Sequence, residues 1–451
     1  MSPQPTDRVP PEEVYATFDL ALRIGEVLQS SGAGAGDVAA QMSNVALSCG
    51  LRGANADVTF TELAMSYQPR QAEPVLLQVR QVRYRETDYG DLTSVDHLVR
   101  DLAEGRIDRE EAAQRLNRIV STGRTRPRWA TTAGSGLVGG GLAVLLGGSW
   151  LVILLALGTA VGIDVLQRRM ARRRLPAFYR QVAGGLFATM VVVGVVALGV
   201  DLSPSRLVTS SIIVLLAGVN FLGAIQDALT GYPVTAGARI LEALMSTAGV
   251  IAGVSGGFQV AGVLGVDLGP VRSEVLGLAP APISILGGAI TAGASAYAAY
   301  APLRSVAPIA VIGGAAIAVY QLALDNALGA PWSAALAALL VGLVAFAVAA
   351  RVRIPALVVV VTGIIPLLPG LSIYRGLIDL TTGGNGIFSM ASAATISIAL
   401  SSGAILGEYL AQPLRREAHR LENRLAGPRL VGPLSVRAVR RRRKPKQPTA
   451  E

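Results

Sequence analysis

Two aspartates, Asp227 and Asp379, occupy the same position in two copies of one apolar segment. Residues 212–231 align with residues 364–383 without a gap, and eight of the twenty aligned positions are identical. An ionisable side chain beside or within an apolar run is costly to keep there, so it is a functional candidate by default. The repeat therefore predicts two equivalent functional carboxylates.

Each copy is also interrupted by a glycine, Gly218 or Gly370, which is followed by a small polar residue, Asn220 or Ser372. Many membrane transporters build a binding site from an apolar helix that breaks and then offers a carboxylate. A zwitterionic substrate would place its ammonium group against the aspartate and its carboxylate against backbone N–H groups at the break. In a partly dry site the same aspartate could instead carry a coupling proton.

The second copy contains two prolines, Pro366 and Pro369, directly before its glycine. Each proline removes a backbone donor, and the ring of Pro369 clashes with the preceding turn, so carbonyl groups are freed at membrane depth. Such carbonyls are tolerated only where protein, water or a ligand satisfies them. A kink satisfied by a neighbouring helix is the alternative, but the coincidence with the repeat favours a site. The first copy has Ala217 in place of Pro369, so the two copies need not contribute equally.

Glu242, Glu408 and Arg375 complete the set of candidate substrate- and ion-binding residues. Both glutamates lie close to or within apolar runs, where a charge is expensive. Arg375 comes four residues before Asp379, and it either belongs to the site or simply neutralises that aspartate.

Enzymatic chemistry is poorly supported by the residue inventory. The sequence has two histidines, His97 and His419, and one cysteine, so we expect no metal site and no cofactor. It contains neither a G-x-x-x-x-G-K-[ST] element nor a convincing nucleophile elbow. We therefore expect a protein that is not an enzyme.

The composition is that of a membrane protein. Of 451 residues, 51% are hydrophobic and only 16% are charged, and the mean hydropathy is +0.50. The net charge of +10 comes mainly from arginine clusters beside apolar runs, which is typical of the positive-inside signal with anionic lipid as the counter-charge. Nucleic acid is not expected as a partner.

Ten apolar segments approach the length that a hydrocarbon core of ~30 Å requires. They cover residues 134–148, 150–166, 181–200, 207–226, 237–262, 281–300, 306–324, 333–350, 355–373 and 387–411. The first two are short, so whether both cross the membrane stays open. The arginines fall in alternate connections, which predicts a multi-pass protein of the cell membrane with both termini cytoplasmic.

The repeated segments lie in the fourth and ninth of these spans, so the membrane region divides into residues 130–262 and 281–411, with five spans each. An odd number of spans makes the second set enter from the opposite face. The sequence thus predicts two inverted repeats, the usual framework for alternating access. Asp227 should lie at the cytoplasmic end of its span and Asp379 at the outer end of its own.

A small α+β soluble domain is expected before the spans, at residues 12–125, after a disordered lead at 1–11. The pattern predicts helices from about 12 to 31 and from 37 to 49, with Asp37 as the N-cap of the second. Strands at 57–67 and 74–85 should form a hairpin, and helices should follow at about 92–104 and 108–121. Residues 412–451 form a basic tail. The overall prediction is a mainly α, polytopic helical membrane protein.

These residues resemble the threonine/serine exporter (ThrE) family. The resemblance is carried by residues 22–33 (LRIGEVLQSSGA), by Arg106, Ile107, Asp108, Glu111, Ala112 and Leu116, by the repeated Leu-x-Gly motif with its aspartate, and by residues 367–370 (LLPG). It extends from about residue 12 to 412. The resemblance implies a cytoplasmic domain before ten spans, and export of small hydroxy amino acids driven by the proton gradient.

We therefore expect a secondary transporter whose partners are an amino-acid substrate, protons and membrane lipid; homo-oligomerisation stays open. Two alternatives remain: export of another small metabolite such as a dicarboxylate, which related two-component systems carry, and a membrane-anchored sensor whose amino-terminal domain binds a ligand.

Overall fold

The computed structural model describes residues 9–425 except 71–72, 83–86, 123–125, 201–206, 209, 212–214, 216–217, 267–277, 370–371, 373–375 and 377–385. For residues 218–220 and 412–425 it describes the backbone only. The predictions for residues 1–8 of the lead, residues 426–451 of the basic tail, Gly370, Arg375 and Asp379 therefore lie outside the described residues. Pro11 of the lead begins a helix, and residues 412–425 of the tail are helical.

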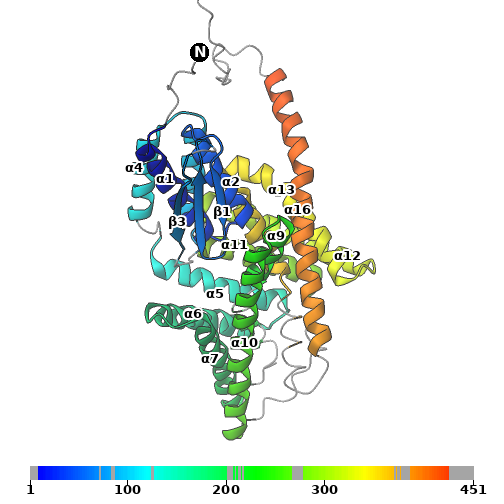
Figure 1. Ribbon diagram of the computed structural model, residues 1–451. Coiled ribbons are helices and arrows are strands. Elements are labelled where there is room, and N and C mark those ends of the chain that lie inside the picture. Colours follow the sequence, from blue (N-terminus) through cyan, green and yellow to red (C-terminus); the bar gives the residue numbers. More distant parts are fainter. Residues whose placement is uncertain are drawn as a thin grey trace, which may run out of the picture.

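Residues 11–122, here called the N-terminal unit, combine four helices with one three-stranded antiparallel sheet of order β1-β2-β3 (Figure 1). Its elements are α1 (Pro11–Ser30), α2 (Ala35–Ser48), β1 (Asn55–Val58), β2 (Glu62–Tyr67), β3 (Leu76–Gln81), α3 (Tyr89–Ala103) and α4 (Arg109–Thr122). Val14, Phe18 and Leu22 repeat every fourth position of α1 and are fully buried. This is the amphipathic helix that the spacing predicts.

Two details of this unit differ from the prediction. The strand expected at 57–67 is two strands, because the Thr59 N–H bonds the Glu62 carbonyl and turns the chain back at residues 60–61. Apolar residues alternate on both sides of this turn, at Val58 and Phe60 and then at Leu63 and Met65, and the alternation shifts by one position between them. Helix α2 begins at Ala35 with Gly34 as its N-cap, so Asp37 is not the N-cap.

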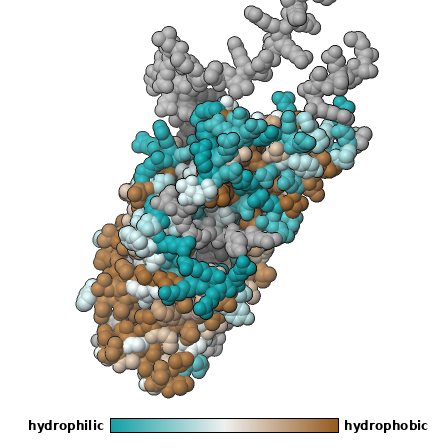
Figure 2. Space-filling view, turned by 90° about the vertical axis from the view of Figure 1, so that its left-hand side faces the viewer, coloured by the Kyte–Doolittle hydropathy of each residue, from teal (hydrophilic) through white to brown (hydrophobic). Residues whose placement is uncertain are grey.

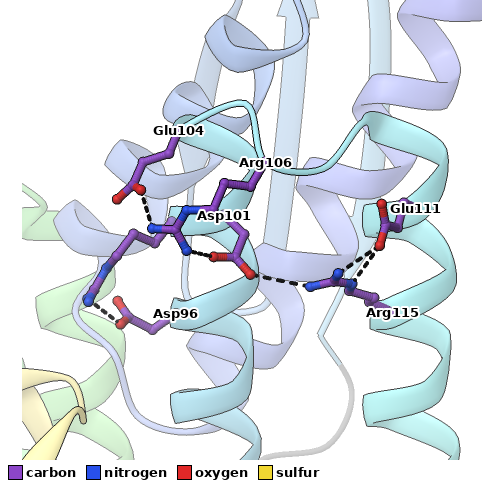
Figure 3. Close-up of polar contacts among 7 residues, drawn as sticks. Asp96, Asp101, Glu104, Arg106, Glu111 and Arg115 are labelled. Atoms are coloured by element: carbon purple, nitrogen blue, oxygen red, sulfur yellow. Dashed lines mark hydrogen bonds and ion pairs between the residues drawn. The ribbon is translucent and has the colours of Figure 1, made fainter. Parts of the chain in front are cut away.

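The exposed face of α3 and α4 carries a network of ion pairs (Figure 3). Arg106 pairs with Asp101 and Glu104, and Arg115 pairs with Asp101 and with Glu111 at 2.7 Å. These arginines are satisfied by neighbouring acids on a solvated surface, where such pairs contribute little to stability.

The remaining chain forms long helices, of which α5, α6, α7 and α10 lie below the N-terminal unit in Figure 1 and α12 and α16 to its right. They are α5 (Arg128–Leu145), α6 (Trp150–Arg172), α7 (Ala177–Ala197), α9 (Gly218–Leu229), α10 (Pro233–Val263), α11 (Ala281–Ala298), α12 (Leu303–Asp325), α13 (Ala330–Val352), α14 (Ala356–Ile364), the 3₁₀ turn η2 (Ile365–Leu367) and α16 (Gly386–Leu425). We call α5–α10 the first helix set and α11–α16 the second.

Seven of the described helices are long and apolar enough to cross a membrane: α6, α7, α10, α11, α12, α13 and the part of α16 up to Ala411. Their outward side chains are largely hydrophobic, and Figure 2 shows this apolar surface gathered over one end of the molecule and the hydrophilic surface over the other. The chain is therefore a multi-pass helical membrane protein. Three predicted spans correspond to the glycine-rich α5, to the partly described segment ending in α9, and to the short α14 with η2, so the count of ten stays a prediction.

The first helices of the two sets, α5 and α11, pack against each other in opposite directions. A Cβ added to the glycines in their contact would collide with the partner helix in three places: Gly134 with Ala298, Gly141 with Thr291, and Gly287 with Leu145. As residue numbers rise along α5, they fall along α11. The two helices are therefore antiparallel, and glycine permits their close approach.

Within each set, the third and last helices pack in parallel. In the first set, Gly249 and Gly253 of α10 face the backbone of Phe178 and Val182 in α7. In the second set, Gly403 and Gly407 of α16 face the backbone of Ala335 and Leu339 in α13. Both contacts use two glycines spaced four residues apart, so the same helix pair is built in the same way twice.

The predicted break in the second copy of the repeat is present. Helix α14 ends at Ile364, tightens into η2, and at Leu368 the backbone becomes extended with φ −56° and ψ 140°. Pro366 lies inside η2, where it has no N–H to donate to the carbonyl four residues earlier, so the α-helix cannot continue.

Candidate functional site

Asp227 lies where the N-terminal unit meets the membrane helices. It is on α9, is wholly buried, and its Oδ1 accepts a hydrogen bond of 2.8 Å from the Ala35 N–H. Ala35 is the first residue of α2, and its N-cap Gly34 has no side chain to satisfy that donor. A carboxylate at a helix N-terminus is favoured by the helix dipole, so Asp227 caps α2 from another part of the chain.

Arg239 of α10 neutralises this buried carboxylate. Its Nη1 lies 3.1 Å from Asp227 Oδ2, and its Nη2 donates a 3.0 Å hydrogen bond to the carbonyl of Ala33. Gly223 of α9 leaves room for the guanidinium, because a Cβ there would lie 2.8 Å from Nη1. We call residues 33–37 together with Asp227 and Arg239 the joint. Both charged side chains are buried, and each needs the other.

A pocket of about 160 Å³ lies beside the joint, between α2, α9 and α16. It is lined by Gly34, Gly36, Asp37, Gln226, Thr230, Ile405, Glu408 and Tyr409. The half-buried Glu408 of α16 thus faces the same pocket as Asp37. The fold has brought three carboxylates and one arginine from four helices into one region.

Of these four groups, Asp37 is the one that belongs to the N-terminal unit. Asp37 is exposed at the pocket by its accessible surface, although many protein atoms lie around its carboxyl group. This desolvation raises the pKa of Asp37, and the charge of the nearby Asp227 raises it further. Asp37 therefore binds a proton more readily than an ordinary surface aspartate.

A second pocket, of about 100 Å³, lies at the break after α14. Pro366, Pro369 and Ser372 line it together with leucine and isoleucine side chains of α5, α12 and α16. It is mostly apolar, and Ser372 and Tyr320 supply its hydroxyl groups. Three predicted site residues thus share one cavity.

The other predicted residues are dispersed. Gly218 and Asn220 lie in the first turn of α9, where only the backbone is described. Glu242 is half-buried on α10, one turn beyond Arg239. Pattern reasoning missed Asp37, which was interpreted as a helix cap, and Arg239, which was interpreted as a topological charge. The glycines at 32, 34 and 36 were the available signal, because they permit close approach of another chain segment.

The arrangement can bind protons and cationic groups, and it lacks the parts of a metal centre. Within the described ranges, no three His, Cys, Asp or Glu side chains converge so as to hold a metal ion. Asp37 and Glu408 line one pocket, and Pro366, Pro369 and Ser372 line the other at the break in the second set.

Comparison with known proteins agrees with this organisation. The family model described as "Putative threonine/serine exporter" matches residues 19–261, and the one described as "Threonine/Serine exporter, ThrE" matches residues 284–410. The boundary between the matches falls between the two helix sets. No solved structure matches the chain.

Two curated relatives match over most of their length. The "Probable threonine/serine exporter" of Mycobacterium tuberculosis is 36% identical over 428 residues, which cover 91% of this chain and 80% of the relative. The "Threonine/serine exporter" of Corynebacterium glutamicum is 33% identical over 420 residues, covering 91% and 86%. The chain therefore belongs to the threonine/serine exporter family, whose members are transporters and not enzymes.

Proposed function

We propose that this protein exports threonine and serine across the cell membrane by alternating access, driven by the proton gradient. The substrate is inferred from the names of the two relatives. The main support for alternating access is the antiparallel contact of α5 with α11. These are the first helices of two sets that are otherwise packed alike, so their opposite directions support an inverted repeat.

Several features support two inverted repeats. The sequence repeat at 212–231 and 364–383 falls at the same place in each set. The pairs α7/α10 and α13/α16 are both parallel and both use glycines four residues apart. If α5 and α11 are equivalent helices, their opposite directions invert one set relative to the other. Two such halves can rock about a central site so that it faces each side in turn.

The substrate site in this proposal is the pocket at the break after α14. Pro366 and Pro369 have no backbone N–H to donate there, and the proposal is that carbonyl groups left available by this break face the pocket, where Ser372 adds a hydroxyl. Freed carbonyls can accept hydrogen bonds from an ammonium group. Gly370, Arg375 and Asp379 are proposed to complete the site from the sequence pattern alone, with Asp379 as the partner of the substrate ammonium.

Glu408 and Asp37 are proposed to carry the coupling proton. Asp227 is proposed to hold α2, which bears Asp37, beside the membrane helices. Glu408 is on the last helix of the second set, and Asp37 of the N-terminal unit lines the same pocket. The proposal includes further candidates on the two helices that flank the joint. They are Gly218 and Asn220 of α9 and Glu242 of α10.

Efflux from preloaded vesicles tests this function. Labelled threonine and serine should leave faster under an imposed pH gradient, whereas a labelled dicarboxylate should not. Replacing both prolines (Pro366→Ala, Pro369→Ala) should reduce efflux at least ten-fold without loss of inserted protein. In a separate variant with both prolines intact, Glu408→Gln should make the rate of efflux insensitive to the pH gradient.

Pro331→Ala is the matched control, because Pro331 lies in the first turn of α13, where a missing N–H breaks no helical bond. If the dicarboxylate alone leaves the vesicles, the proposed substrate is wrong and the protein exports a dicarboxylate. Absence of flux for every solute would favour a sensor.

A further inference from the structure

The N-terminal unit is bonded to both helix sets on one face of the membrane region. Its contacts with the first set are those of the joint, together with a 3.3 Å hydrogen bond from Thr235 Oγ1 of α10 to the carbonyl of Val58. It contacts the second set through the Tyr89 N–H, which donates to the carbonyl of Ala299 at 2.9 Å, and through His97, whose Nε2 lies 3.1 Å from the carbonyl oxygen of Arg353.

This arrangement constrains how the sets can move. A rigid body bonded to both sets resists any displacement of one relative to the other at this face. Opening this face, as the proposed alternating access requires, must therefore break one group of contacts. The inference rests on the proposed function in this step only.

The contacts with the first set are those best suited to break. At the joint they are two hydrogen bonds beside a pocket, one from the Ala35 N–H to Asp227 and one from Arg239 to the Ala33 carbonyl. The ion pair between Asp227 and Arg239 lies within the first set, so it does not have to break when α2 leaves. Asp37 adds a second negative charge close to Asp227. Residues 33–37 have small side chains apart from Asp37, so they can leave the surface of α9 without extracting a large apolar group.

We propose that the joint is a latch: the N-terminal unit closes one face of the transporter while Asp227 and Arg239 hold α2, and each transport cycle requires this contact to open. The N-terminal unit is then a moving part of the transporter, and Asp227 acts as a positioning residue that fastens it.

A disulfide across the joint tests whether opening is required. A Cβ built at Gly36 lies 3.5 Å from Thr230 Cβ, within the range that a disulfide spans. The double variant Gly36→Cys, Thr230→Cys is made in a Cys49→Ser background, which removes the single native cysteine. Oxidation should reduce threonine efflux at least ten-fold relative to the same protein reduced, and dithiothreitol should restore it.

The oxidant has to leave efflux by the Cys49→Ser protein unchanged. Complete disulfide formation, verified by mass spectrometry, with undiminished efflux would show that the joint stays closed during transport and would overturn the latch.

A second measurement does not depend on the substrate being correct. Thr235 is 1% exposed beneath the N-terminal unit. In the variant Thr235→Cys, Cys49→Ser, the thiol should react with a maleimide only when the joint opens. Adding Asp227→Asn should increase the reaction rate at least ten-fold, because the ion pair with Arg239 is lost while an oxygen remains for the Ala35 N–H. Equal rates with and without Asp227→Asn would contradict the latch.

The two tests separate the two proposals. If the native protein moves neither threonine nor serine, the proposed function fails, and the maleimide rates still decide whether the joint opens. If efflux is normal and Thr235→Cys is equally unreactive in both backgrounds, the function stands and the latch fails.

Discussion

At the scale of single residues, Asp227 shows how a buried charge is accommodated. Its position in an apolar run made it a functional candidate, and the structure surrounds it with a backbone N–H and a guanidinium. Removing one partner of a buried ion pair typically costs 3–5 kcal/mol, because the other charge stays buried. The pair therefore holds α9 and α10 together, while the hydrogen bonds to Ala35 and Ala33 connect both helices to the N-terminal unit. The charge of Asp227 also raises the pKa of the neighbouring Asp37.

Asp37 should make stability depend on pH. Its pKa is raised in the folded state, so the folded protein holds this proton more tightly than the unfolded chain does. Stability from this group is thus greatest at low pH and is lost as pH rises through the raised pKa. Asp37→Asn should flatten that part of the curve and raise the melting temperature near pH 7, measured by thermal unfolding in nanodiscs between pH 4 and 8.

Glu110→Gln is the control for this prediction, since Glu110 is an exposed acid in the first turn of α4. Parallel melting curves for Asp37→Asn and the native protein would show that the pocket leaves the Asp37 proton unaffected.

At the scale of elements, glycine positions decide which helices pack closely. On α10, a Cβ at Gly253 would collide with the backbone of Val182 and Leu186 in α7, whereas one at Gly256 would meet nothing within 4 Å. Glycines in an apolar helix favour close packing in general. The sequence does not reveal which glycines face a partner, because that depends on how each helix is rotated.

Gly253→Ala should therefore destabilise the protein and Gly256→Ala should not. Overpacking of this kind costs about 1–3 kcal/mol, while alanine at an open helical position gains about 0.5–1 kcal/mol over glycine. Denaturation in mild detergent, with the two variants compared on the same helix, measures the difference. Equal effects would mean that α7 and α10 are not in this register.

At the scale of the whole molecule, the N-terminal unit defines one face of the membrane region. Helix α12 starts near the contacts of Tyr89 with Ala299 and runs for 23 residues, about 34 Å, so its end lies on the opposite face. The end of α6 lies on the same face as the unit, because Arg168 donates hydrogen bonds to the Arg128 carbonyl and Thr131 Oγ1 at the start of α5.

Single cysteines placed after these helices should be labelled from opposite sides. In a Cys49→Ser background, Asn326→Cys should react with an impermeant maleimide in intact cells, and Arg173→Cys only after lysis, if the N-terminal unit is cytoplasmic. Labelling of both variants in intact cells would refute this topology. The reversed pattern would place the unit outside.

Much of the architecture was predictable from local physical chemistry. Apolar runs of membrane length and the proline break at Pro366 each depend on residues close together in the chain, and the described helices follow them. The N-terminal helices were predicted to within a few residues for the same reason. The topology inferred from the arginines stays a prediction. The turn between β1 and β2 was missed because the apolar alternation resumes directly after it, and the shift of one position after Phe60 was not interpreted as a reversal.

The sequence by itself determined that the chain is a helical membrane protein of this transporter family with costly acids in apolar runs. Only the tertiary structure decided what those acids contact. Asp227 meets Ala35, 192 positions earlier in the chain, and Glu408 faces the pocket that contains Asp37. Such contacts depend on how separate elements dock. Docking balances the cost of removing charged groups from water against the energy of pairing them over the whole interface, and no local sequence pattern contains that balance.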